Sequence, residues 1–407
     1  MTLKTFVCII VLVIKLSKIY FHIDVNNAFL SWEAIYLMQN GEKTDIRTIE
    51  SAVAGDPKKR TGVILAKSTK AKAMGVKTGE AIFQAKSKCP NLVLYPPHHE
   101  FYNEQSKKMK ELLKNYSDVV QPYSIDEYFI EYIPLLGDYI SVAHEIQNKI
   151  FKELGFTVNI GISDTKYLAK IASDLEKPSK IHTLFKNEIK EKFWPLKIED
   201  MFLLGPQSAK KLKTIGIDTV GKLANTNVKI LKVHLKSHGE ELYKFSWGMD
   251  IDEKHEKKSV PKSISHSKTS SYDLINLDEI YNFILDIVND TCIRLRHENM
   301  KTKNISVTLK TSNFDIYSSS TTLNTSSNST SEIFKICKQI FKDMYKKEPL
   351  RLIGVNLSCL EPNHTSQLNL FDSTNEKSCK LEKTVDSLLE KFNDPGLITR
   401  GSLIKSK

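Results

Sequence analysis

The alternation of apolar and polar side chains along residues 19–25 predicts a β-strand near the N-terminus. One face of this strand would carry Ile19, Phe21, Ile23 and Val25, and the other Tyr20, His22 and Asp24. We expect a half-buried strand that ends near Asp24, because period-two alternation is typical of a strand with one covered face. Asn26 or Asn27 would cap a helix that begins at Ala28, since asparagine is a favoured N-cap residue.

A second strand pattern, YSIDEYFIEY at 123–132, carries two adjacent acids, Asp126 and Glu127, in its middle. Neighbouring residues of a regular strand face opposite ways, so one carboxylate would be driven into the core. The pair therefore predicts a strand end, a bulge or a hairpin tip, where both carboxylates can reach one cation. By itself this segment also fits an edge strand with two solvated acids.

Asp24 favours a cation site over a solvated edge strand, because it would end a strand beside the strand that bears the other two acids. Three carboxylates placed in this way are typical of a two-cation phosphoryl-transfer site, in which two ions stabilise the attacking and the leaving oxygens. Carboxylate oxygens suit hard cations such as Mg²⁺. The two strands together therefore favour a magnesium site.

The rest of the pattern predicts a mixed α+β chain of several domains, two to four for a length of 407 residues. Alternating strands and a lysine-rich helix would fill 44–95, and amphipathic helices are expected at 98–118 and 139–154. A strand would enter a helix within 157–182. Beyond it we expect a helical region at 186–250 and a charged linker at 251–262. The last part of the chain would contain strands at 304–310, 314–323 and 351–360 and helices at 276–298 and 331–346. Ser329 to Glu332 has the pattern of a capping box.

Composition narrows the classes of partner and compartment. A net charge of +11 and a pI of about 9.0 favour a polyanionic partner, although a solvated lysine-rich surface would give the same totals. The six cysteines include no CxxC pair, which indicates a reducing, cytoplasmic compartment without zinc or a disulfide framework. The apolar run at 6–14 is too short to span a bilayer. We expect residues 1–18 to be an extension outside the fold and no membrane partner.

Two motifs, HIDVNNAFLSWE at 22–33 and YSIDEYFI at 123–130, resemble the palm motifs of the Y-family translesion DNA polymerases, in particular the bacterial DNA polymerase IV and UmuC-like branch. The similarity continues through 63–79, 159–182, 203–223 and 351–357. It implies a right-hand polymerase with an additional little-finger domain. The implied parts are a palm (19–43 with 96–185), fingers (44–95), a thumb (186–250), a linker (251–262), a little finger (263–361) and a C-terminal tail (362–407).

The resemblance also assigns roles in the catalytic centre. Asp24, Asp126 and Glu127 would hold two Mg²⁺ ions, and Val25 would add only its backbone carbonyl. Phe29 would be the steric gate, whose ring fills the space that a ribose 2′-hydroxyl needs, so the enzyme would take deoxynucleoside triphosphates. From its helical position alone, Phe29 could equally be a core residue.

Further contacts follow from the same resemblance. Thr69, Lys72 and Lys166 would bind the triphosphate, although Thr69 replaces a tyrosine and Lys72 an arginine that are common in the family, and each lysine could also be a surface residue. A helix-hairpin-helix-like motif in the thumb would hold a DNA phosphate through Gly205, Ser208, Lys210 and Gly216. Leu203 stands where the family often has glycine. The hydroxyl-rich run 317–331 would line a sheet and contact the DNA backbone.

The tail carries a peptide that resembles the one by which bacterial polymerases bind the sliding clamp, with Gln367, Leu368, Leu370 and Phe371 as anchors. The implied function is template-directed, error-prone translesion synthesis on a primed DNA template by a monomer that the clamp recruits. A catalytically weak DNA- and clamp-binding factor and a metal nuclease are the rival interpretations. The three acids argue against the first rival, and Phe29 with the triphosphate lysines against the second.

Overall fold

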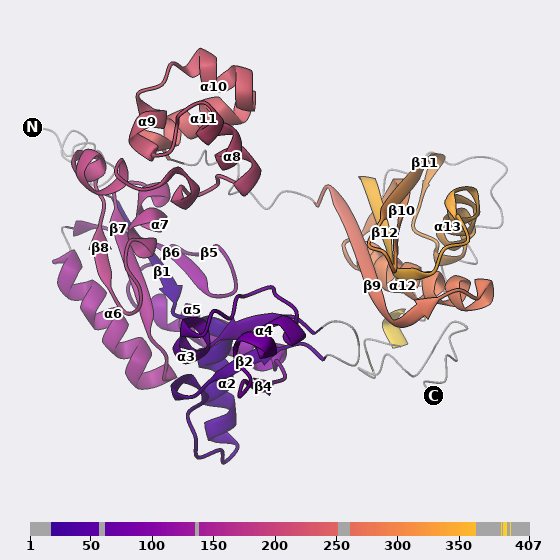
Figure 1. Ribbon diagram of the computed structural model, residues 1–407, viewed down its shortest axis with the longest axis horizontal. Coiled ribbons are helices and arrows are strands. Elements are labelled where there is room, and N and C mark those ends of the chain that lie inside the picture. The colour runs from indigo at the N-terminus through magenta and orange to yellow at the C-terminus, as the bar shows by residue number, and fades with distance from the viewer. Residues whose placement is uncertain are drawn as a thin grey trace, which may run out of the picture. The chain divides into compact units, whose positions relative to one another are not determined.

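The computed structural model describes residues 18–56, 62–134, 138–250 and 261–363, together with 384, 386–388 and 391. Expectations for the N-terminal extension, most of the linker and the clamp peptide fall outside the described residues, apart from a few flanking positions. The chain divides into two compact units, one formed by Met1–Gly55 with Val63–Glu256 and the other by Asp56–Gly62 with Lys257–Lys407. The mixed α+β class is confirmed (Figure 1). No helix in the described ranges is long and apolar enough to cross a membrane.

The first unit is built on a five-stranded sheet in the order β5-β6-β1-β7-β8. Its strands are β1 (Ile19–Val25), β5 (Val120–Pro122), β6 (Glu127–Tyr132), β7 (Val158–Ser163) and β8 (Ile181–Thr183). The central strand β1 pairs antiparallel with both β6 and β7. This pairing places the motif that contains Asp24 beside the motif that contains Asp126 and Glu127, as a shared catalytic site would require.

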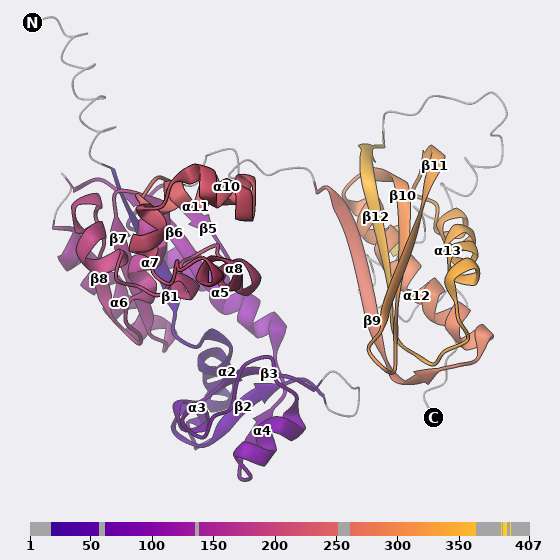
Figure 2. The ribbon, with the colours of Figure 1, turned by 45° about the horizontal axis from the view of Figure 1, so that its top comes forward.

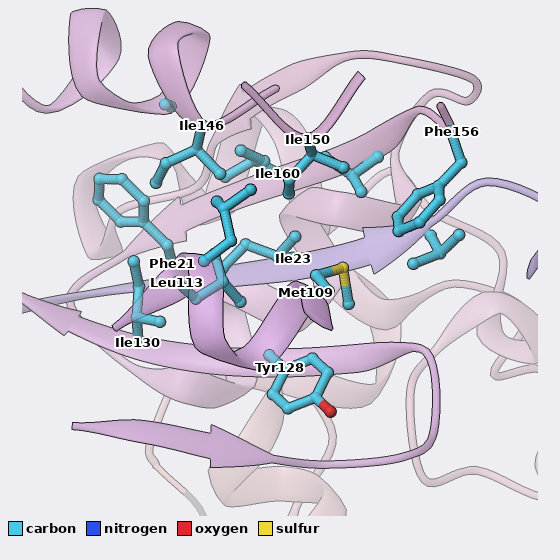
Figure 3. Close-up of a cluster of buried hydrophobic side chains, with 14 of the residues drawn as sticks. Phe21, Ile23, Met109, Leu113, Tyr128, Ile130, Ile146, Ile150, Phe156 and Ile160 are labelled. Atoms are coloured by element: carbon cyan, nitrogen blue, oxygen red, sulfur yellow. The ribbon is translucent and has the colours of Figure 1, made fainter. Parts of the chain in front are cut away.

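Helices cover both faces of β1. On one face, Phe21 and Ile23 pack in a buried cluster with side chains of α5 (His99–Leu113) and α6 (Tyr139–Leu154) (Figure 3). On the other face, α7 (Lys166–Asp174) contacts β1 and β7, and His22 is fully buried beneath it. The expectation of a half-buried strand was therefore wrong, because α7 covers the polar face as well.

A smaller three-stranded sheet, β3-β2-β4, forms the segment expected to be the fingers. It consists of β2 (Ser51–Ala54), β3 (Ile64–Lys67) and β4 (Val93–Tyr95), with α3 (Thr69–Ala73) and α4 (Ile82–Lys88) (Figure 2). The segment has its own apolar core, and a second small core joins it to α2 (Ala28–Gln39). Alternating strands and a lysine-rich helix in this region are confirmed.

The C-terminal part of the first unit is helical. After short helical turns, η4 (Lys186–Glu188), η5 (Ile189–Phe193) and η6 (Ile198–Asp200), four helices follow: α8 (Pro206–Thr214), α9 (Val220–Ala224), α10 (Val228–Leu235) and α11 (Ser237–Ser246). Their buried side chains form one cluster with Tyr167, Leu168 and Ile171 of α7. The helix that covers the polar face of β1 is therefore fixed from both sides.

The second unit has a four-stranded sheet, β11-β10-β12-β9, and two helices that share one buried cluster with it. The elements are β9 (Ser263–Leu274), α12 (Leu277–His297), β10 (Met300–Thr311), β11 (Ile316–Ser327), α13 (Thr330–Met344) and β12 (Leu350–Pro362). The expected strands and helices are present, but β9 was not predicted. Near the C-terminal end of α12, Arg296 forms a two-armed ion pair with Asp386 of the tail.

Two expected helix caps differ in the structure. Asn27 adopts a left-handed conformation (φ 51°) before α2, and its side chain donates to the Lys67 carbonyl (2.8 Å) instead of capping the helix. At α13, Glu332 accepts a hydrogen bond from Ser327 (2.6 Å), so the expected box between Ser329 and Glu332 does not form. In both cases the side chain that was expected to cap the helix forms its hydrogen bond elsewhere, Asn27 with a distant residue and Glu332 with a residue that precedes the helix.

Candidate active site

The strand register brings the three predicted acids to one end of the large sheet. Asp24 lies directly opposite Glu127 in the antiparallel pair of β1 and β6. Asp126 belongs to the connection between β5 and β6, and its carbonyl accepts a hydrogen bond from the Val25 amide (3.1 Å). Asp126 therefore lies in the turn of the β5–β6 hairpin and Glu127 at the start of β6, so the pair occupies a strand end beside a hairpin tip, as two of the three predicted placements have it.

Two lysines pair with Asp24 and Glu127. Lys170 of α7 lies with its ammonium 2.8 Å from the Glu127 carboxylate, 3.0 Å from Asp174 and 3.7 Å from Asp24. Lys177 donates to Asp24 and to Asp174 (2.8 Å). Asp24 is only 5% exposed. A buried carboxylate is costly unless it is paired, so these ammonium groups stabilise the cluster.

Burial and pairing shift the proton affinities in this cluster. Burial raises the pKa of Asp24 above its ordinary range, and the nearby Lys177 only partly offsets this effect. The pKa of Glu127 is likewise raised by burial, against the opposing pull of Lys170. Burial alone would lower the pKa of Lys170, but the carboxylates of Asp174, Glu127 and Asp24 outweigh it, so the net shift is upward. Lys170 therefore stays charged.

His22 adds a fully buried imidazole beneath the acids. Its Nδ1 lies 2.8 Å from the Ser173 hydroxyl, which itself donates to the Lys170 carbonyl. The hydroxyl hydrogen is used, so Nδ1 must donate, and Nε2 presents a lone pair. Nε2 lies 3.9 Å from the Glu127 carboxylate and has no hydrogen-bond partner. Burial, and then Lys170, lowers the pKa of His22, which keeps the ring neutral.

The fit to metal ions rests on the donor set. Within the described ranges, no three His, Cys, Asp or Glu side chains are gathered into a metal-binding group. Each of the three acids has another partner: Asp126 accepts from the Ser124 hydroxyl (2.5 Å), while Asp24 and Glu127 bind lysines. The three carboxylates are hard oxygen ligands. The two bound ammonium groups show that the carboxylates stabilise positive charge at this position. The residues present therefore fit divalent ions such as Mg²⁺.

Phe29, the predicted steric gate, lies half-buried in the first turn of α2 and is held by other aromatic rings. Its ring stacks on Tyr102 (5.3 Å between centroids, 20° between planes) and meets His99 edge-on (6.1 Å, 86°). Tyr102, from α5, was not identified from the sequence, because nothing local connects it to position 29.

The expected triphosphate residues divide into two groups. Thr69 and Lys72 lie exposed on α3, where Ser68 caps the helix through the Ala71 amide. Lys166 is 8% exposed and donates to the Gln121 side chain (2.7 Å) rather than to the acids. Among the described residues, the lysines that contact the acids are Lys170 and Lys177, neither of which received a role from the sequence. Their roles depend on the packing of α7, which no local signal reveals.

The expected phosphate-binding residues of the helical region lie around α8. Gly205 precedes the helix, with open space where a Cβ would stand, and Lys210 is exposed. Ser208 is half-buried, and Gly216 (φ 81°) makes the turn after the helix. Leu203 also has a positive φ (68°), so it adopts the backbone conformation that favours glycine. The hydroxyls of β11 line a largely exposed edge strand, and a DNA contact there stays a prediction.

Comparison with known proteins identifies the family. Residues 23–174 match the model of the impB/mucB/samB family, and residues 261–370 match its C-terminal domain. The chain is 41% identical over 395 residues to DNA polymerase IV of Clostridium acetobutylicum, which covers 96% of this chain and 100% of that protein. DNA polymerase IV of Clostridium kluyveri is 33% identical, with 96% and 99% covered.

A solved structure gives the same result for the fold. A chimera of the Y-family DNA polymerases Dbh and Dpo4 superposes with a TM-score of 0.71 at 20% identity, covering 85% of this chain and 100% of that one. The right-hand polymerase fold is thereby confirmed, whereas the individual domain boundaries stay predictions. Together with the matches in sequence, this places the chain in the Y-family of DNA polymerases, within its DNA polymerase IV branch.

Proposed function

We propose that this chain, a DNA-directed DNA polymerase by family, performs translesion synthesis by two-metal nucleotidyl transfer at Asp24, Asp126 and Glu127. The observation that carries the proposal is the register of β1 and β6, which places Asp24 opposite Glu127 with Asp126 at the adjoining hairpin tip. Three carboxylates at one sheet end serve phosphoryl transfer, whereas a surface that only bound DNA would gain nothing from negative charge there.

The carboxylates would hold two Mg²⁺ ions, which when bound favour loss of the primer 3′-hydroxyl proton and neutralise the leaving pyrophosphate. The Val25 carbonyl would supply a further ligand. Lys177 has a 40% exposed side chain, so once Asp24 no longer binds it, its ammonium can turn to a nucleotide phosphate. We therefore add Lys177 to Thr69, Lys72 and Lys166 as a triphosphate ligand.

The remaining contacts follow the same logic. Phe29 would exclude ribonucleotides by overlap with the 2′-hydroxyl, and the exposed start of α8, from Gly205, would hold a template phosphate without reading sequence. Gln367, Leu368, Leu370 and Phe371 would bind the sliding clamp and raise processivity. A cytoplasmic monomer working on primed DNA is the form that we propose.

Primer extension tests the proposal. The purified chain should extend a short primed template with Mg²⁺ and deoxynucleoside triphosphates, and Asp126→Ala should abolish extension while DNA binding is kept. Asp118→Ala is the matched control, because Asp118 is an exposed acid just before β5, away from the three carboxylates. Extension that survives in Asp126→Ala would refute this site. A shortened primer would point to a nuclease, and DNA binding without extension to a non-catalytic factor.

The clamp peptide needs a separate readout. Replacing Leu370 and Phe371 by alanine should leave single-nucleotide insertion unchanged and shorten the products made with the clamp present. Equal product lengths with and without the two substitutions would contradict recruitment through this peptide.

A further inference from the structure

A buried carboxylate lies behind the aromatic ring that we assign as the gate. Glu33 follows Phe29 by four residues in α2, so the two side chains lie on the same side of the helix. Glu33 is fully buried. Its Oε2 accepts a hydrogen bond from the Tyr102 hydroxyl (2.5 Å), and its Oε1 lies 2.9 Å from His98 Nδ1. Both partners come from α5 and its first flanking residue.

Tyr102 connects this carboxylate to Phe29. Its ring stacks on the Phe29 ring at 5.3 Å and 20°, while its hydroxyl is bound at the opposite end by Glu33. Burial, and then the bond to Glu33, raises the pKa of Tyr102, so the hydroxyl keeps its proton and remains a donor. A tyrosine held at both ends has little freedom to tilt, and the ring packed on it shares that restriction.

His98 completes the arrangement from the solvent side. Its side chain is 35% exposed, and its ring stacks on Tyr36 at 3.9 Å and 25°. Among the described residues, His98 supplies the second side-chain hydrogen-bond contact of the Glu33 carboxyl group, after the Tyr102 hydroxyl. Without it, the buried carboxyl group would keep only the Tyr102 hydroxyl, and an under-satisfied buried polar group is costly.

We propose that Glu33 and His98 are positioning residues for sugar discrimination, acting through Tyr102 on Phe29. The inference rests on the proposed function, since it needs Phe29 to be the gate. Rejection of a 2′-hydroxyl by overlap depends on where the wall stands, so a ring free to shift accepts more ribonucleotide. Glu33 and His98 both bind groups around Tyr102 rather than the reacting atoms, so their effect belongs to selectivity rather than to the chemical step.

The test measures the ratio of kcat/KM for a deoxynucleotide to that for the matching ribonucleotide. Tyr102→Phe keeps the stacked ring and removes only the bond to Glu33. We expect it and His98→Ala to lower the ratio by about three- to tenfold, the factor that loss of one hydrogen bond corresponds to. The deoxynucleotide kcat/KM should stay nearly unchanged, because a shifted ring does not obstruct a sugar that lacks the 2′-hydroxyl. His98→Gln, which retains a donor, should recover part of the ratio.

Tyr116→Phe is the matched control. It also removes a tyrosine–glutamate hydrogen bond, from Tyr116 to Glu145 (2.9 Å), but on the far end of α5. Its selectivity should equal that of the unsubstituted protein. Glu33→Gln should lower the ratio as well, and if this variant fails to fold, Tyr102→Phe and His98→Ala still decide the question.

The outcomes separate this inference from the function on which it rests. No extension by the unsubstituted protein would refute the proposed function, and an unchanged ratio in Phe29→Ala would refute the gate. A ratio that falls in Phe29→Ala but stays constant in both Tyr102→Phe and His98→Ala would overturn the positioning role alone. A fall in Tyr116→Phe as large as in Tyr102→Phe would also overturn it, because the effect would then be general.

Discussion

Substitution of Gly161 by alanine should destabilise the first unit and weaken its catalytic centre at the same time. Gly161 lies in β7, directly opposite His22 of β1, where α7 crosses the sheet. A Cβ at this position would stand 2.0 Å from the Ala169 carbonyl oxygen and 2.3 Å from the Ser173 amide nitrogen. Both are backbone atoms of α7, so no side-chain rotation can relieve the overlap.

The size of the effect follows from these distances. To restore an ordinary contact of 3.4 Å from 2.0 Å, the helix would have to retreat by 1.4 Å (3.4 − 2.0). Overpacking of a well-packed site typically costs about 1–3 kcal/mol. For a unit of this size, each kcal/mol lowers the melting temperature by about 2–4 °C, so we expect a fall of about 2–12 °C.

Activity should fall further than stability alone explains. The same retreat would carry Lys170 away from Glu127, from which it now lies 2.8 Å, and extension should drop even at temperatures where the variant is folded. Thermal denaturation and primer extension on one preparation measure both effects.

Gly205→Ala is the control for the Gly161 substitution. Gly205 has an ordinary φ of −73° and open space around a Cβ, so it should lose only about 0.5 kcal/mol, the preference of an N-cap for glycine. If Gly161→Ala melts at the temperature of Gly205→Ala, close packing of α7 on β7 does not limit stability, and the argument is refuted.

Three further predictions concern other parts of the chain. Asn276→Ala should cost about 1 kcal/mol in thermal denaturation, because the Asn276 side chain caps α12 through two amides, and an unchanged melting temperature would contradict this role. Asp386→Asn should speed tryptic cleavage of the tail, since Asp386 pairs with the buried Arg296, and equal rates would argue against docking. Asp45 has a pKa lowered chiefly by its bond to Arg47, so its contribution to stability is present above pH 3.8 and is lost as the pH falls below it. Asp45→Asn should therefore lower the melting temperature more at pH 7 than at pH 3, and a pH-independent difference would refute the assignment.

The sequence predicted the parts of the site that depend on local pattern. Alternation along 19–25 gave β1 and the place of Asp24 at its end, and the adjacent acids Asp126 and Glu127 required a break in a strand, which the structure has as a hairpin tip. Both inferences use the period of a strand and the cost of burying a charge, and neither needs knowledge of distant residues.

Features that depend on distant contacts could not be predicted in this way. The second covered face of β1 requires α7, which begins more than 140 positions later, and Lys177 reaches Asp24 across 153 positions. Asn27 does occupy the N-cap position that local preference predicts, but its left-handed backbone (φ 51°) comes without a side-chain cap, and its amide donates to the distant Lys67 carbonyl. In each case the local sequence pattern predicted that the residue has a structural or chemical role. It predicted the partner of that residue only where the partner is close in the sequence.

The two lysines at the acid cluster pair with its carboxylates without any divalent ion, so we expect the fold of this region to be independent of such ions. In small metal domains, the ligands carry charge that only the metal balances, and a chelator unfolds them. Here Lys170 and Lys177 already neutralise Asp24 and Glu127 within the chain. Under the proposed two-ion mechanism, an ion that binds Asp24 or Glu127 would displace an ammonium group of the same molecule. The chain would then compete for its own ligands, which would weaken ion binding and let ions exchange while the sheet around them stays intact.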